Sequence, residues 1–205
     1  WHLPIAPEQT EIHGFPITMH NTEGSPERDP QTARDCAKFV KQKRNKPFFA
    51  VASFVNPHDI CEWARGETGK EGAIDPAPAP KNCPKLPENF EIPACEPDSL
   101  REVQKDAERM FPTTQWGRQK WRQYRWAYQR LVEKVDAEIA KLLSGLRESG
   151  IENNTLVIFT SDHGDGYAAH RWNQKSVLYE ESTRVPLILS WKGKLSQAVD
   201  REHLV

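Results

Sequence analysis

Two short polar segments combine side chains that could bind a metal ion or transfer a proton, and each directly follows an apolar run. Asp162 and His163 come after the run from Leu156 to Thr160, and His58 comes soon after the run from Phe48 to Val55. A carboxylate and an imidazole can both ligate a metal ion, and an imidazole can exchange a proton near neutral pH. A lone histidine in such a place is more simply a turn residue that caps backbone groups. Two histidines in equivalent positions favour a polar functional site.

The apolar runs predict the strands that must position these side chains. Apolar and β-branched residues without alternation indicate strands buried on both faces, as in the parallel sheets of α/β proteins. Asp162 and His163 would then lie at the carboxyl end of a parallel strand, at the sheet edge where ligands usually bind. His170 and Lys175 follow in a polar loop and add to the same site.

The remaining periodicity predicts two helices and one more strand. One helix opens near Asp29 and ends before Pro47, where proline cannot continue it. Apolar residues at three- and four-residue steps predict a long helix from about residue 115 to residue 149, which Gly150 ends. Residues 184–191 indicate a further strand. The sequence therefore predicts an α/β fold.

Residues 56–114 lack clear periodicity and hold most of the prolines and three of the four cysteines. So long a connection is rare in a compact domain unless it has a function, so we interpret it as a loop-rich insertion that covers the site. Cys83 and Cys95 flank a proline-rich loop and could form a disulfide in an oxidising compartment, with unpaired thiols as the alternative. The cysteine spacing does not suit a structural zinc site.

Composition narrows the class of partner. The chain has 205 residues, a net charge of −1 and a sequence pI of about 6.7, so no overall field favours nucleic acid or an anionic membrane. The apolar runs are too short to span a bilayer. The segment from Trp116 to Trp126 mixes arginine with aromatic residues, which could stack on nucleic-acid bases. Because it merges into the long helix, packing on the sheet or lining a cleft is the better interpretation.

Several motif-like segments follow one another along the chain: Trp1-His-Leu3, Phe48-Phe to Asn56-Pro-His58, Leu86-Pro-Glu-Asn-Phe90, Asn154 to Asp165, Leu178 to Glu181 and Arg184 to Ile188. In this order the segments resemble the type I sulfatases. Each short motif is weak, but their ordered combination from end to end is specific. The resemblance implies part of an alkaline-phosphatase-like sandwich, with a mostly parallel central sheet flanked by helices, and hydrolysis of sulfate esters.

One departure from the family is large. The family's N-terminal part carries paired metal-binding aspartates and a motif whose Cys or Ser becomes formylglycine, and it has no counterpart here. None of the four cysteines is followed by x-Pro-x-Arg. The resemblance therefore implies that residues 1–205 are a fragment of a sulfatase catalytic domain. We expect the nucleophile upstream of Trp1, in a missing N-terminal part of the same protein, and we expect the fragment alone to be inactive.

The resemblance also implies a metal site. By this resemblance, Asp162 and His163 would complete the coordination of a divalent cation, with Ca²⁺ expected, that polarises the sulfate and the nucleophile. Many relatives have asparagine at the position of His163, and an imidazole is a less usual ligand for calcium. Mg²⁺, Mn²⁺ and Zn²⁺ are therefore alternatives.

Four further residues take expected roles from the same resemblance. Lys175 would contact the sulfate and the leaving-group oxygen, where a compact ammonium charge is suited, with a solvated loop lysine as the alternative. His58 would be the general acid, and His2 would assist the formylglycine hydrate. His170 would line the substrate entrance or be a surface histidine.

Two other functions stay open at this point. A phosphonate monoester hydrolase or phosphodiesterase of the same superfamily shares this frame and differs in the central atom and leaving group. A catalytically inactive member could instead bind sulfated glycans. For an active sulfatase we expect a small-molecule or glycan sulfate ester as substrate. Many relatives are exported, which favours a periplasmic or secreted location.

Overall fold

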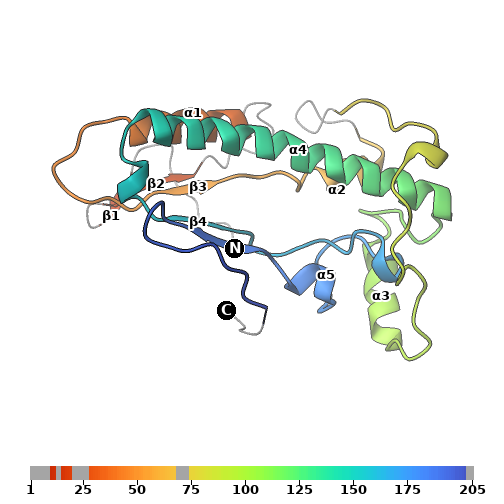
Figure 1. The fold of residues 1–205 in the computed structure, drawn as a ribbon. Helices are drawn as coiled ribbons and strands as arrows, with labels where there is room; N and C mark the ends of the chain where they lie inside the picture. Colours follow the sequence, from red (N-terminus) through yellow and green to blue (C-terminus); the bar gives the residue numbers. More distant parts are fainter. Residues whose placement is uncertain (1–9, 13–14, 20–27, 68–73, 202–205) are drawn as a thin grey trace.

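The computed structural model describes residues 10–12, 15–19, 28–67 and 74–201. Helices and strands alternate along these ranges, which confirms the predicted α/β class (Figure 1). His2 and the Trp1-His-Leu3 segment lie outside the described residues. The elements are β1 (Thr10–Ile12), β2 (Phe15–Met19), α1 (Arg28–Val40), β3 (Val51–Ser53), α2 (Ile60–Arg65), η1 (Pro80–Asn82), α3 (Asp98–Ala107), α4 (Arg118–Glu148), η2 (Glu152–Asn154), β4 (Val157–Thr160), η3 (Ala169–Arg171), α5 (Glu180–Thr183) and β5 (Leu187–Ser190).

Helix α4 is the longest element and forms the spine of the molecule (Figure 1). Its buried residues recur at three- and four-residue steps, as the sequence predicted, through Trp121, Tyr124, Ala127, Leu131 and Val135. Gly150 follows its end with φ 76°. Glycine adopts this left-handed conformation without steric cost, so the predicted end of the helix is confirmed.

The core is an aromatic cluster on the first half of α4. The Trp121 side chain contacts Trp116 at a ring-centroid distance of 5.1 Å and Tyr124 at 5.6 Å, both in edge-on geometry. Burial of each such ring contributes roughly 2 kcal/mol. The aromatic residues of the Trp116–Trp126 segment therefore pack in the core, and its Arg122 donates hydrogen bonds to the backbone carbonyls of residues 81 and 84.

Helix α1 packs along the second half of α4. A Cβ at Gly145 would lie 2.8 Å from the Cβ of Ala37, so a glycine permits this close approach of the two helices. Helix α1 confirms the predicted first helix but ends at Val40, several residues before Pro47. No helix among the ranges given above is long and apolar enough to cross a membrane.

The strands form two small sheets. Strand β2 pairs antiparallel with β1 and parallel with β3, while β4 pairs antiparallel with β5. The predicted mostly parallel central sheet is therefore not what the described residues form. The prediction that the strand before Asp162 is buried on both faces is also wrong for this chain, because the adjacent Ile158 and Phe159 are 56% and 39% exposed. Neighbouring side chains point to opposite faces, so both faces of β4 lack cover.

Residues 56–114 are not structureless, since they contain α2, η1 and α3. Helix α2 contacts α4, and η1 also lies against α4. Cys83 is buried and Cys95 is exposed, and both are free thiols, so the alternative of an unbridged pair holds.

Candidate active site

The turn after β3 presents His58. The backbone N–H of His58 donates to the carbonyl of Val55 at 3.0 Å, and the Asn56–Pro57 peptide bond is cis. His58 is exposed, but protein atoms close to its imidazole remove part of the hydration of the ring. That burial is the first cause of a lowered pKa of His58, and the positive charge of Lys175 is the second. The neighbouring Asp59 raises the pKa and partly opposes both.

Lys175 and His163 both lie within electrostatic reach of His58. Lys175 and His163 both lower the pKa of His58 through their charges. Lys175 also acts on Cys61 in α2, where burial raises the pKa of the thiol and the ammonium charge opposes that rise. The turn after β3 thus lies near two later positions of the chain, His163 and Lys175.

Asp162 and His163 stand side by side at the end of β4. The Asp162 Oδ2 and the His163 Nε2 are 3.4 Å apart, and the Asp162 side chain is 84% exposed. His163 Nδ1 lies 2.7 Å from the carbonyl oxygen of Gly164, a contact that requires the proton on Nδ1. In the neutral ring the Nε2 lone pair therefore faces the Asp162 carboxylate. The His163 Nε2 and the Asp162 Oδ2 are then both electron-pair donors with no proton between them. Such a pair fits a metal cation bound by both atoms.

The described part of the chain supplies these two groups and no cluster of three or more His, Cys, Asp or Glu residues suited to a metal. The expected divalent cation therefore fits Asp162 and His163 as part of a ligand set. Gly164 fixes the turn that follows them. Its N–H donates to the carbonyl of Ser182 at 2.8 Å, and a Cβ there would lie 1.9 Å from the carbonyl oxygen of Glu181. A side chain at this position would force β4 and α5 apart.

Asp165 anchors the loop that leads to Lys175, a role that the sequence analysis missed. Its partly buried carboxylate accepts hydrogen bonds from the Tyr124 hydroxyl at 2.8 Å, from the Tyr167 N–H at 2.8 Å and from the Gln174 N–H at 3.0 Å. Burial raises the pKa of Asp165 to about 6, and these hydrogen bonds oppose the rise. The signal available was an acidic residue directly after the Asp-His-Gly segment.

The Asp165–Lys175 loop is strained as well as anchored. Five of its residues other than glycine have positive φ values. Such conformations cost energy and persist only where surrounding contacts hold them. The Cys61 thiol adds one such contact, because the Gln174 amide nitrogen lies 3.1 Å from its sulfur. The residues are Tyr167, Ala168, His170, Arg171 and Gln174.

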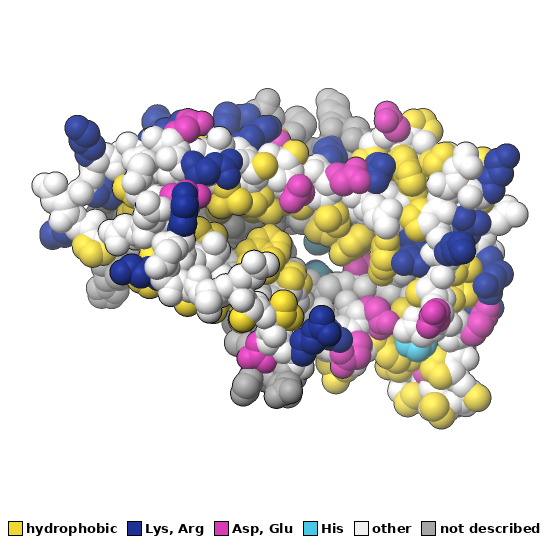
Figure 2. All heavy atoms as spheres, viewed as in Figure 1, with side chains coloured by type: hydrophobic (Ala, Val, Ile, Leu, Met, Phe, Trp, Pro, Cys, Tyr) yellow, Lys and Arg dark blue, Asp and Glu magenta, His cyan; other side chains and the backbone are white. Residues whose placement is uncertain are grey.

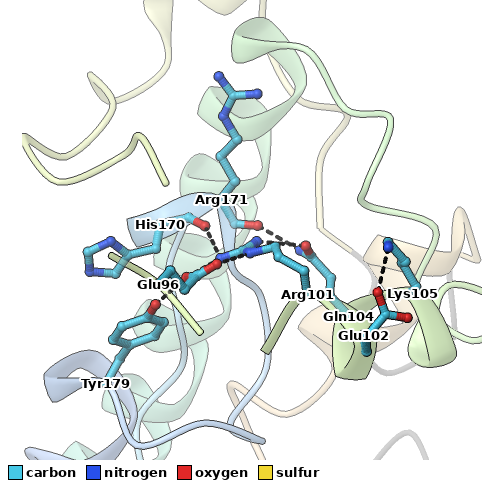
Figure 3. A network of polar contacts seen from close by, with 8 residues as sticks. All are labelled: Glu96, Arg101, Glu102, Gln104, Lys105, His170, Arg171 and Tyr179. Atoms are coloured by element: carbon cyan, nitrogen blue, oxygen red, sulfur yellow. Dashed lines mark hydrogen bonds and ion pairs between the residues drawn. The ribbon is translucent and has the colours of Figure 1, made fainter. Parts of the chain in front are cut away.

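His170 belongs to a separate polar network (Figure 3). Its ring stacks on Tyr179 at a centroid distance of 4.2 Å, and the Tyr179 hydroxyl bonds to Glu96. Glu96 also pairs with Arg101, which donates to the backbone carbonyl of His170 at 3.0 Å. The ring Nε2 lies 3.4 Å from the Asn89 amide nitrogen. His170 is therefore held by residues of the 56–114 segment rather than placed beside His58 by a direct contact.

Solved structures share this arrangement of helices and strands. A 2-O GAG sulfatase superposes with a TM-score of 0.68 and 26% identity over 82% of this chain and 36% of its own. The elements thus follow the alkaline-phosphatase-like fold of sulfatases. A family model described as Sulfatase matches residues 14–204, and the chain belongs to the sulfatase family.

Curated relatives agree with this family. The chain is 30% identical over 180 residues to a Delta 4,5-hexuronate-2-O-sulfatase from Bacteroides thetaiotaomicron, which covers 86% of this chain and 37% of that protein. It is 28% identical over 167 residues to Arylsulfatase K from Xenopus laevis, covering 79% of this chain and 30% of the relative. The chain therefore spans about a third of the length of these relatives, and the resemblance to sulfatases is confirmed.

Proposed function

We propose that the protein to which this chain belongs hydrolyses sulfate esters by metal-assisted attack of a formylglycine nucleophile that lies outside residues 1–205. The single observation that carries the proposal is that Lys175 and His163 lie within electrostatic reach of His58, in a chain of the sulfatase family. Asp162 lies beside His163 and is exposed to solvent.

Cleavage of a sulfate ester has three requirements, and this chain offers groups for two of them. The anionic sulfuryl oxygens need positive charge, which the Lys175 ammonium supplies. The leaving alkoxide needs a proton, which His58 can donate from its imidazolium form. The nucleophile is the third requirement, and His2 remains a prediction as the residue that assists it.

A divalent cation, when bound, would polarise the sulfate group and stabilise its developing charge. Asp162 and His163 are the residues of this chain that would hold it, with the remaining ligands outside. We keep Ca²⁺ as the first expectation and Mg²⁺, Mn²⁺ and Zn²⁺ as alternatives, because His163 brings a nitrogen ligand. The Nδ1 contact of His163 with the Gly164 carbonyl holds the ring so that Nε2 can bind.

The proposed substrate is the sulfate ester of a glycan or small molecule. The relative with 30% identity is named for a 2-O-sulfated unsaturated hexuronate, and the structural neighbour is named for 2-O-sulfated glycosaminoglycan. A 2-O-sulfated uronic acid is therefore the first substrate to test.

The test uses the purified full-length protein with an aryl sulfate, the matched aryl phosphonate and a 2-O-sulfated unsaturated disaccharide. We expect release of inorganic sulfate, and we expect a chelator to abolish it and added Ca²⁺ to restore it. Preferential turnover of the phosphonate would assign the protein to the phosphonate hydrolases. Binding of the disaccharide without any turnover would instead make it a glycan-binding member.

A further inference from the structure

We propose that Arg28 and Asp29, the first two residues of α1, are positioning residues that hold the turn carrying His58. The inference rests on the proposed function, in which His58 donates a proton to the leaving group. Both residues contact the turn from opposite sides, one before His58 and one after it.

Asp29 holds the residues that precede His58. Asp29 is buried, with an exposed fraction of only 6%. One carboxylate oxygen accepts the Val55 N–H at 2.7 Å, and the other accepts the backbone N–H of Asn56 at 3.0 Å and its side-chain amide at 3.1 Å. Hydrogen bonds to an ionised acceptor are roughly twice as strong as neutral ones. Three such hydrogen bonds join the Asp29 carboxylate to two consecutive residues, Val55 and Asn56.

Arg28 holds the residue that follows His58. Its guanidinium Nη2 lies 3.0 Å from the Asp59 Oδ1, and the two side chains are 11% and 2% exposed. An ion pair so removed from water is geometrically well defined. Asp59 also precedes α2 directly, so the pair joins the starts of two helices.

His58 depends on these contacts because, among the described residues, its ring has no hydrogen-bonded anchor of its own. Within the described residues, no side chain forms a hydrogen bond with the imidazole, although the Lys175 charge reaches it. In this part of the chain the ring is therefore placed through the backbone of its turn. Helix α1 packs on α4, so Arg28 and Asp29 start from a rigid support.

The experiment must separate positioning of His58 from a general contribution to stability, since an acidic residue in the first helical turn also stabilises a helix. We would measure turnover in the full-length enzyme for Asp29→Asn, His58→Ala and the double variant, using a sulfate ester with a poor leaving group. Glu148→Gln is the matched control, because it removes a carboxylate that binds Lys41 at 2.6 Å just beyond the other end of α1.

We expect Asp29→Asn to lower kcat on the order of 100-fold with KM nearly unchanged, because the proton donor is misplaced. In the His58→Ala background the same substitution should change kcat by less than about threefold, since its effect passes through His58. The defect should also shrink for an aryl sulfate whose leaving group needs no proton. Equal losses in both backgrounds would overturn the proposal and leave Asp29 a general structural role.

A second readout does not depend on activity. Amide hydrogen exchange at Val55 and Asn56 should accelerate in Asp29→Asn and stay unchanged in Glu148→Gln. Unchanged exchange in Asp29→Asn overturns the positioning role even in a fully active enzyme. If the wild-type enzyme is inactive on sulfate esters but Asp29→Asn still accelerates exchange, the proposed function is refuted. The role of Asp29 in holding the turn is then still established. If Asp29→Asn does not fold, Arg28→Gln carries the same measurements at the other side of the turn.

Discussion

The Lys175 ammonium has two effects. It lowers the pKa of His58, and in the proposed mechanism it would neutralise a bound sulfate. Replacing Lys175 by alanine in the full-length enzyme should lower turnover by about 100-fold or more, because charge stabilisation of the transition state is lost. The melting temperature should change little, since the side chain is exposed. Steady-state kinetics and thermal unfolding measure both effects. Near-normal turnover in a correctly folded variant would remove Lys175 from the mechanism.

The same pair predicts a pH effect. A general acid must be protonated, and the pKa of His58 is lowered from its ordinary value of 6.5. As the pH rises, His58 therefore loses its proton at a pH below 6.5. The value of kcat/KM for a substrate with a poor leaving group should begin to decline at that pH. Lys175→Ala removes one cause of the lowering, so the pKa of His58 should rise in that variant. A histidine NMR titration measures the shift, and a pKa that falls or stays constant would contradict the coupling.

Sequence patterns predicted His58, His163 and Lys175 as site residues because each follows an apolar run or lies in a motif. They did not reveal Asp29 or Asp165. The partners of Asp29 lie 26 and 27 residues further along the chain, and Tyr124 lies 41 residues before Asp165. A buried carboxylate that accepts backbone N–H groups has no local signature, because its function depends on which segment the fold brings to it.

At the level of elements, α3 and the loop before it support the strained loop that leads to Lys175. Glu96 accepts from Arg101 and Tyr179, and its side chain is 2% exposed. Gln104 of α3 donates to the carbonyl of Arg171 at 2.8 Å. The 56–114 segment is therefore built into the His170 region, which the sequence could indicate only through its length and proline content.

Glu96→Gln should destabilise the protein by about 2 kcal/mol at neutral pH, because the half-buried guanidinium of Arg101 loses its charged partner. The hydrogen bond from Arg101 is the first cause of a lowered pKa of Glu96, below its ordinary value of 4.5. The folded state therefore keeps the carboxylate ionised at lower pH than the unfolded state does. This stabilisation is fully present above pH 4.5 and is lost as the pH falls through the lower folded-state pKa.

Denaturant unfolding of the wild type and the variant across that range tests the sign. The difference in free energy of unfolding should be largest above pH 4.5 and should shrink at lower pH. Glu102→Gln is the matched control, because its pair with Lys105 is exposed on both sides. A difference that grows on acidification would show that the pair is not ionised in the folded state.

Periodicity in the sequence predicted which segments are helices and which are strands. It did not predict which faces of those elements are buried. The long run of apolar side chains at helical steps suffices to predict α4, because its buried stripe faces residues of this same chain. The strand predicted from Phe48 to Val55 contracts to Val51–Ser53. The apolar run at β4 was correctly a strand, but its expected burial needs a second layer that these residues do not supply.

At the scale of the whole molecule, the β4–β5 sheet leaves apolar cross-strand pairs exposed on both faces. Ile158 lies opposite Leu189 and Phe159 lies opposite Ile188, with exposed fractions between 39% and 56%. Figure 2 also shows hydrophobic side chains at the surface below α4. Soluble monomers rarely expose large contiguous apolar patches. Because the sulfatase relatives are about three times longer than this chain, we expect the rest of the protein to cover this sheet.

Residues 1–205 expressed alone should therefore bind a hydrophobic dye and associate at micromolar concentration. Replacing the Ile158 and Leu189 pair by Lys and Glu should reduce both effects, because the two new charges lie opposite each other. In the full-length protein the same double substitution should cost about 3 kcal/mol of stability, since it would bury charge in a covered sheet. Val132→Lys on the exposed side of α4 should be neutral in both proteins. If the full-length protein tolerates the paired substitution as well as it tolerates Val132→Lys, the sheet is a surface in the whole enzyme and the missing layer lies elsewhere.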